Sequence, residues 1–179
     1  MNEDPEGISP GESPQAEGLV VKWEILLARA GCGRPVIDHA RAVTDLALRF
    51  AKSPLVNRDL LLAGAMLHDI GRGVTQGIDH AQRGAALARA LALDECIVSI
   101  IERHIGAGMT ADECSIERLV PRDCIPETVE EKIVANADNL VDGDRQVTIE
   151  GTLGGAFRLK RRIRRSIYRL YLEMESFRT

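Results

Sequence analysis

The most constraining feature of the sequence is the spacing of its apolar residues, which recur every three or four positions from Leu19 almost to the C-terminal end. This spacing places them on one face of an α-helix. No stretch keeps the alternation of a β-strand for more than a few residues, and aromatic residues make up only 3% of the chain. The sequence therefore predicts an all-α fold. Its 179 residues suffice for one compact helical bundle with a sizeable core and are too few for two ordinary domains.

Start signals divide this pattern into separate helices. Asn57 and Asp94 stand where N-caps are needed, and Thr110 with Glu113 fits a capping box. Pro126 stands where a first-turn proline would open a helix. We expect helices over about 19–30, 35–52, 57 to the stretch at 68–71, 79–93, 94–106, a short one after 110, 126–141 and 155–176.

The two ends of the chain differ in composition from the middle. Residues 1–17 contain three prolines, five acidic residues and no large apolar cluster, which predicts a disordered tail before a folded domain over 18–179. The helix expected at 155–176 is amphipathic, and seven Lys or Arg residues fall between 158 and 169. We interpret it as a docked helix with a solvated basic face; attraction of nucleotide or RNA phosphates is the alternative.

Charge and leader signals limit the classes of partner. With 23 Lys and Arg against 27 Asp and Glu, the formal net charge is −4, so the overall charge does not favour binding of a polyanion. A local basic patch is still compatible with this net charge. No apolar run is long enough to span a membrane, and the N-terminal residues lack the basic and apolar segments that a secretory leader would be expected to show. The four cysteines form no C-x-x-C pair. These features predict a cytoplasmic protein with reduced thiols and no membrane contact.

All four histidines fall on the apolar face of a predicted helix. A single inward histidine is more often a satisfied core residue than a ligand, and an inward Asp usually pairs with Arg or caps a helix. Here, however, Asp138 shares an apolar face as well and Asp69 directly follows a histidine, and burying all of them is costly unless something pairs with them. Imidazole and carboxylate together suit Fe, Mn, Zn or Ni, so the sequence predicts a metal centre. The histidines are His39, His68, His80 and His104.

The order and context of these residues resemble the HD-domain superfamily of metal-dependent phosphohydrolases. The resemblance covers about residues 35–145 and rests on VIDHARAV, AMLHDIGR, GIDHAQRGA, IIERHIG and NADNLVDGDR. The order H…HD…H…H…D looks like the binuclear branch. The last part of the motif, at His104, Gly106, Asp138 and Arg145, is most similar to bacterial diadenosine tetraphosphate hydrolases of this fold. Two stretches also resemble an archaeal group of HDIG-domain proteins, namely HIGAGMT and IPETVEEKIVANADNLVDGDR.

The resemblance implies a ligand set and a reaction. Two divalent transition metal ions (Fe, Mn, Ni or Zn) would be bound, the first by His39, His68, Asp69 and Asp138 and the second by His80 and His104, with Asp69 bridging. A bridging water would supply hydroxide near neutral pH and attack a phosphate ester or anhydride of a nucleotide-like substrate. Asp69 would thus be catalytic, with Arg72 and Arg145 as phosphate clamps. The expected partner is a small-molecule phosphate rather than a nucleic acid.

Two other functions remain open on the same residues. Some HD-fold proteins use a mixed-valent di-iron pair with the same ligand types to activate O₂. A non-catalytic nucleotide- or RNA-binding module that uses the basic last helix is the second alternative. Residues 71–79, with three glycines, and residues 106–125 are expected either to line the mouth of the site or to serve as a connector and a cover for the core.

Overall fold

Helices carry almost all of the regular structure, which confirms the all-α prediction. The computed structural model describes residues 14–155 and 160–178. Within these ranges the helices are α1 (Pro14–Arg29), α2 (Arg34–Ala47), α3 (Arg58–Leu67), α4 (His80–Ala90), α5 (Glu95–Arg103), α6 (Ala111–Ile116), α7 (Val129–Asn139), α8 (Ile149–Gly155) and α9 (Arg161–Arg178). The 3-10 turns η1 (Leu48–Phe50) and η2 (Ile70–Gly73) follow α2 and α3, and a short hairpin pairs β1 (Val141–Asp142) with β2 (Arg145–Gln146).

The capping signals act where the sequence places them. Asn57 Oδ1 accepts from the backbone N–H of Leu60 at 3.1 Å and starts α3. Asp94 Oδ1 accepts from the N–H of Cys96 at 2.7 Å and starts α5. Thr110 begins α6 with the predicted capping box. Each cap satisfies a backbone donor that the first turn of a helix leaves free.

Helix α7 begins later than predicted, and Pro126 is not in its first turn. Thr128 is the N-cap: its hydroxyl accepts from the N–H of Glu131, whose carboxylate accepts from the N–H of Thr128 in return. This reciprocal capping box satisfies two backbone donors at once, so it fixes the start of the helix two residues beyond the proline.

The two ends of the chain also differ from the prediction. Helix α1 begins at Pro14, inside the segment 1–17 expected to be disordered, and residues 1–13 lie outside the described residues. The last helix, expected over 155–176, begins later than predicted, because α8 ends at Gly155 and α9 runs from Arg161 to Arg178. Residues 156–159, including the predicted cation Arg158, lie outside the described residues.

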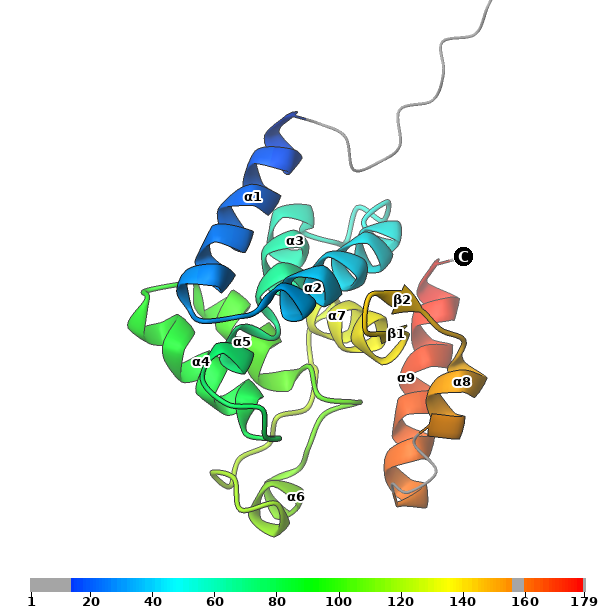
Figure 1. Ribbon diagram of the computed structural model, residues 1–179. Helices are drawn as coiled ribbons and strands as arrows, with labels where there is room; N and C mark the ends of the chain where they lie inside the picture. The colour runs from blue at the N-terminus through cyan, green and yellow to red at the C-terminus, as the bar shows by residue number, and fades with distance from the viewer. Residues whose placement is uncertain (1–13, 156–159, 179) are drawn as a thin grey trace, which may run out of the picture.

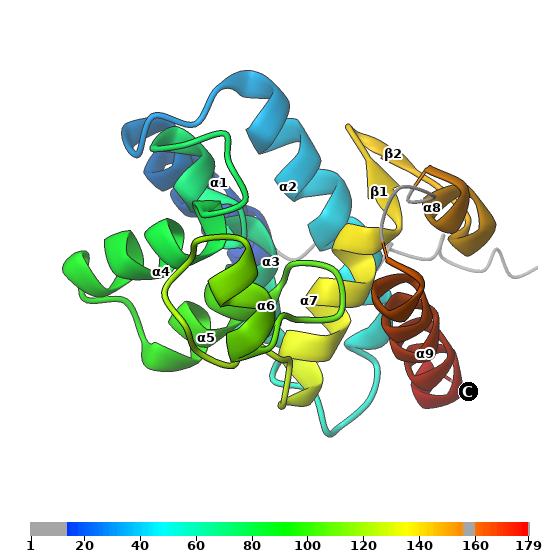
Figure 2. The ribbon, with the colours of Figure 1, turned by 90° about the horizontal axis from the view of Figure 1, so that it is seen from below.

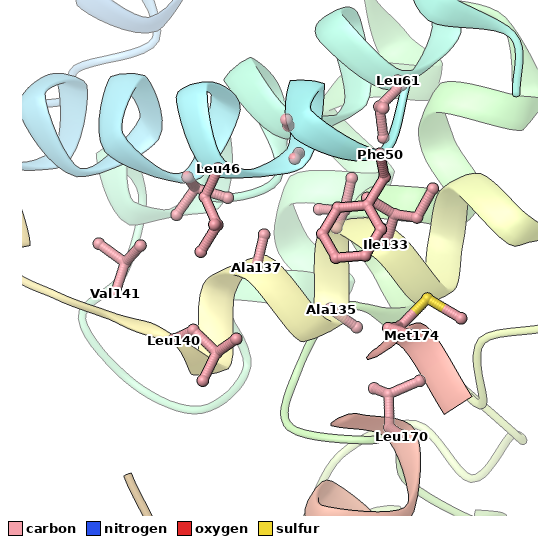
Figure 3. Close-up of a cluster of buried hydrophobic side chains, with 14 of the residues drawn as sticks. Leu46, Phe50, Leu61, Ile133, Ala135, Ala137, Leu140, Val141, Leu170 and Met174 are labelled. Atoms are coloured by element: carbon pink, nitrogen blue, oxygen red, sulfur yellow. The ribbon is translucent and has the colours of Figure 1, made fainter. Parts of the chain in front are cut away.

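Helix α3 occupies the middle of the molecule and packs against α1, α2, α5 and α7 (Figure 1). Every residue from 61 to 70 is buried. On one side lies the cluster shown in Figure 3, where Phe50 and Ile133 meet and Leu170 and Met174 of α9 point towards α7. On the other side, apolar residues of α1, α4 and α5 form a second cluster around Leu67. The predicted docking of the last helix through its apolar face is thus confirmed.

None of the helices in the described part of the chain combines the length and the apolar character that a bilayer crossing requires.

Candidate metal centre

The predicted ligands converge from five helices on one point at the centre of the bundle. His39 lies in α2 and Asp138 near the end of α7, while His80 is the first residue of α4. His68 is the C-cap of α3, and His104 is the C-cap of α5. Helix ends meet here because α5 packs against α3, α4 and α7. Asp69, which directly follows His68 at the start of η2, completes the set.

Asp69 and Asp138 lie between the histidines. Asp69 Oδ1 is 3.1 Å from His80 Nε2 and 3.6 Å from His104 Nε2, and its Oδ2 is 3.9 Å from His68 Nε2. Asp138 Oδ1 is 3.0 Å from His39 Nε2 and 3.5 Å from His68 Nε2. Three overlapping groups of these residues place their ligand atoms within 4.8 Å of one another, and Asp69 belongs to a group with either pair of histidines.

Every histidine has its other ring nitrogen bonded to a backbone carbonyl. His68, His80 and His104 each donate from Nδ1 to the carbonyl three residues earlier, at 2.7, 2.9 and 2.8 Å. His39 instead donates from Nδ1 to the carbonyl of Gly143 in the hairpin turn, at 2.7 Å. Because these bonds hold a proton on Nδ1, Nε2 of each ring faces the centre, and a ring in its neutral form presents a lone pair there, as metal-binding histidines do.

The centre fits a cation better than a purely hydrogen-bonded core. His80 Nε2 and His104 Nε2 are 3.1 Å apart, and two lone pairs at this separation repel unless a cation or a proton lies between them. His68 is fully buried, and its Nε2 has no hydrogen-bond partner. Buried polar atoms without partners are costly, so an unpaired nitrogen facing two carboxylates indicates a position for a positive ion.

The electrostatics of the site support the same conclusion. Burial would lower the pKa of His68, but the carboxylates of Asp69 and Asp138 outweigh it and raise this pKa to about 9. Burial would raise the pKa of both aspartates, but the neighbouring histidines hold each well below the usual range. Burial lowers the pKa of His104 to about 4. At neutral pH the carboxylates are therefore ionised and His104 is neutral, the forms that bind a metal, whereas His68 carries a proton that a bound metal ion would displace.

A cleft of about 400 Å³ opens over the centre. Its polar wall includes Arg72, whose Nε donates to Asp69 Oδ1 at 3.3 Å and whose Nη1 donates to the carbonyl of Gln76 at 3.0 Å. Among the described residues that line the cleft, Arg72 carries the one guanidinium. The apolar residues of its lining are Pro35, Val36, Ile105 and Val141.

The structure does not bring Arg145 to the cleft. Its side chain is 89% exposed and its nearest ionic partner is Asp144, 4.0 Å away. Arg145 lies in β2, where the chain has already turned away after Gly143, and it is absent from the lining. The expectation of a second clamp at this position is therefore not supported by its location.

The hairpin turn is the part of the site that the sequence analysis missed. Gly143 adopts a positive φ of 61°, which lets the chain reverse tightly and present its carbonyl to His39. The dipeptide Gly143-Asp144 forms the two-residue loop between the paired residues Asp142 and Arg145, and as a hairpin signal it would have predicted this turn. Nothing local, however, indicates that its carbonyl meets a side chain 104 residues away.

The two stretches expected at the mouth behave differently. In residues 71–79, Gly71 sits against α4 so closely that an added Cβ would lie 1.9 Å from the His80 carbonyl, and Gln76 lines the cleft. In residues 106–125, Gly106 lines the cleft, whereas α6 does not reach it. The rest of this segment packs on α4, where Gln82 exchanges two hydrogen bonds of 2.9 Å with the backbone of Val120.

Comparison with known proteins identifies relatives of this chain. An uncharacterised protein of Methanocaldococcus jannaschii is 43% identical over 127 residues, which cover 68% of this chain and 75% of that protein. The tRNA (cytidine(56)-2′-O)-methyltransferases of Thermoplasma volcanium and Picrophilus torridus are 44% and 47% identical over 70% and 64% of this chain. The match spans only 37% and 34% of these methyltransferases, about a third of their length.

A solved structure and a family model agree with this relationship. The HD domain of the Listeria monocytogenes phosphodiesterase PgpH, determined in complex with cyclic-di-AMP, has a TM-score of 0.52 and 14% identity, covering 87% of this chain and 94% of that one. This likeness shows the fold. The family model of the HD domain matches residues 36–141, more than half of the chain, and these residues hold all six converging side chains. The chain belongs to the HD-domain family.

Proposed function

We propose that this protein is a metal-dependent phosphohydrolase that cleaves a phosphate ester or anhydride of a nucleotide-like molecule. One observation carries the proposal: four Nε2 atoms and two carboxylates converge, while every Nδ1 is bonded to a backbone carbonyl. A packing role would not require all four rings to expose the same nitrogen to one point. The HD domain is a metal-dependent phosphohydrolase fold, which agrees with this donor set.

The residues divide naturally between two ions of Fe, Mn, Ni or Zn type. His39, His68, Asp69 and Asp138 would hold the first, and His80 with His104 the second. Asp69 is suited to be shared because its two oxygens face different histidines, Oδ1 towards His80 and Oδ2 towards His68. When bound, the ions would supply Lewis-acid polarisation of a phosphoryl group and activation of water near neutral pH.

Arg72 is the candidate phosphate clamp. Its Nε and Nη1 are engaged with Asp69 and the Gln76 carbonyl, while Nη2 makes no hydrogen bond to the described residues. The guanidinium is held in place by the first two contacts, so its free edge is oriented before substrate arrives. In this position it would donate to a phosphate oxygen and offset the charge that develops on it.

The apolar part of the cleft lining supports a nucleotide-like substrate over inorganic phosphate. Pro35, Val36, Ile105 and Val141 offer apolar surface for a base or a sugar, beside the polar residues that would take the phosphate. The PgpH domain, which shares the fold, was determined with cyclic-di-AMP bound, so this architecture accommodates a nucleotide.

The test is turnover of a phosphate-compound panel by the purified full chain with added Mn²⁺, with products separated by chromatography. The panel holds diadenosine tetraphosphate, which the motif resemblance favours, with linear and cyclic nucleotides, cyclic dinucleotides and nucleoside monophosphates. We expect cleavage of one class, lost in Asp69→Ala and retained in the control Asp144→Asn, which removes an exposed carboxylate.

Two outcomes would redirect the assignment. The first outcome is that no compound of the panel is cleaved although metal is bound. If the iron form then takes up oxygen in the presence of substrate, the result would support the di-iron oxygenase instead. Full activity in His68→Ala would refute a role for the cluster in catalysis altogether.

A further inference from the structure

Helix α9 turns a continuous basic face to the outside of the molecule. Its apolar side chains Ile167, Leu170 and Met174 are buried against α7, which fixes the helix's orientation. Figures 1 and 2 show α9 at the edge of the molecule, on the side away from α4. The residues opposite the buried side are all exposed, and we call them the arginine face: Arg161, Arg165, Tyr168, Arg169 and Leu172.

The arginines of this face have no acidic partners among the described residues. Arg161, Arg165 and Arg169 form no ion pair, in contrast to Arg162 on the flank of the helix, which lies 3.3 Å from Glu113. The nearby carboxylate of Glu173 is already paired with Lys132 at 2.7 Å. Most other exposed arginines of this acidic protein are paired, so three adjacent unpaired guanidinium groups form a distinct positive surface.

Spacing and an exposed aromatic ring indicate the kind of ligand. Residues four apart on a helix are separated by about 6 Å along its axis, which is comparable to the distance between successive phosphates of an extended nucleic-acid strand. Tyr168 is 43% exposed between two of the arginines, and its ring stacks on Tyr171 with centroids 6.3 Å apart and planes at 25°. Arginines that follow a backbone beside a ring that accepts a base are the elements of single-strand binding.

We propose that the arginine face binds a single nucleic-acid strand, with Arg161, Arg165 and Arg169 on successive phosphates and Tyr168 stacked on a base. A membrane surface fits less well, because the apolar side of α9 is buried in the core and unavailable for insertion. A second copy of the chain also fits less well, because a two-fold contact centred here would set the arginines of both copies against each other.

This surface is separate from the metal centre and does not depend on the proposed hydrolysis. Ile167, on the buried side of α9, faces Gly106 of the cleft lining, where an added Cβ would lie 3.7 Å from its Cδ1, so the arginines project from the other side of the same helix. Binding can therefore be measured without turnover, and its failure would leave the phosphohydrolase proposal untouched.

The experiment is fluorescence anisotropy of labelled 12-nucleotide single strands, one of RNA and one of DNA, with the full chain in EDTA after circular dichroism has verified its fold. Three phosphate contacts on a single strand predict a log–log salt slope of about −2, or roughly 20-fold weaker binding between 50 and 200 mM salt. In the triple variant R161Q/R165Q/R169Q we expect the slope to approach zero. Tyr168→Ala should weaken binding by about 5-fold or more without changing the slope, and Tyr168→Phe should retain it.

The matched control removes the same three charges elsewhere. R34Q/R89Q/R122Q replaces exposed arginines that are paired with carboxylates, and it should bind within twofold of the parent chain. Equal binding by R161Q/R165Q/R169Q and the parent, or an equal loss in the control, would overturn the proposal. Tighter binding to phosphatidylglycerol vesicles than to either strand would assign the face to a membrane instead.

Discussion

The substitution Gly71→Ala should disrupt the proposed metal centre, although Gly71 is not itself one of the proposed ligands. A Cβ at this position would lie 1.9 Å from the backbone carbonyl of His80 and 2.8 Å from the N–H nitrogen of Gly84. A real Cβ essentially never lies within 3.0 Å of such an atom, so the first turn of α4 must move by at least about 1.1 Å. His80 begins that turn, and its Nε2 lies 3.1 Å from Asp69 Oδ1. Metal–ligand distances tolerate only about 0.2 Å, so the shift removes one ligand.

The expected result for Gly71→Ala is a loss of bound metal together with a modest loss of stability. Overpacking of this kind costs about 1–3 kcal/mol, which lowers Tm by roughly 2–12 °C in a chain of this size. Metal content after gel filtration and a thermal melt followed by circular dichroism measure both effects. Gly154→Ala is the control, because nothing lies within 4 Å of its added Cβ. Unchanged metal content and Tm in Gly71→Ala would refute the close-approach argument.

Further predictions concern the cap of α7, the guanidinium of Arg72 and the cysteine thiols. Thr128→Ala removes the capping box of α7 and should cost about 1 kcal/mol of unfolding free energy in a denaturant titration, whereas Thr128→Ser should retain it. Arg72→Lys keeps the charge but cannot donate to both of its present acceptors, so kcat/KM on the substrate found by the panel should fall at least about tenfold; a value within twofold of the parent would exclude the clamp. With a thiol reagent such as DTNB, Cys96 should react in the folded protein because it is exposed, and more slowly than a free thiol because its hydrogen bond with Asp94 raises its pKa and reduces the thiolate. Burial raises the pKa of Cys124 to about 11, so this thiol should react with the reagent only when the protein unfolds. Rapid reaction of a second thiol in the folded protein at pH 8 would contradict this.

Local rules explain the parts of the fold that could be predicted. The caps at Asn57, Asp94 and Thr110 were predicted correctly because each bond joins residues only two or three positions apart. The start of α7 was placed wrongly although its signal is equally local. The Thr-x-x-Glu pattern at 128–131 satisfies two donors, whereas Pro126 satisfies none, so the capping box outweighs the proline.

The candidate site likewise has features that local rules predict and features that depend on the tertiary structure. The inward direction of all four histidines could be predicted, because the helical period alone sets which face a residue occupies. The position of Arg145 could not, because its distance from the centre depends on how the hairpin folds back after α7. Gly71 in the His-Asp-Ile-Gly motif could be recognised as part of a signature, but the reason for a glycine there is its contact with α4.

By itself, the sequence determined the helical class, most helix starts and the set of six converging side chains, because these depend on period, capping and residue type within a few positions. Only the tertiary structure decided which nitrogen of each ring faces the centre, since His39 is oriented by a carbonyl 104 residues away. It also decided that Arg72 and not Arg145 lines the cleft, and that three arginines of α9 remain unpaired. Such outcomes depend on distances between segments that are remote in the chain, and those distances are set only when α3 and its neighbours pack into one core.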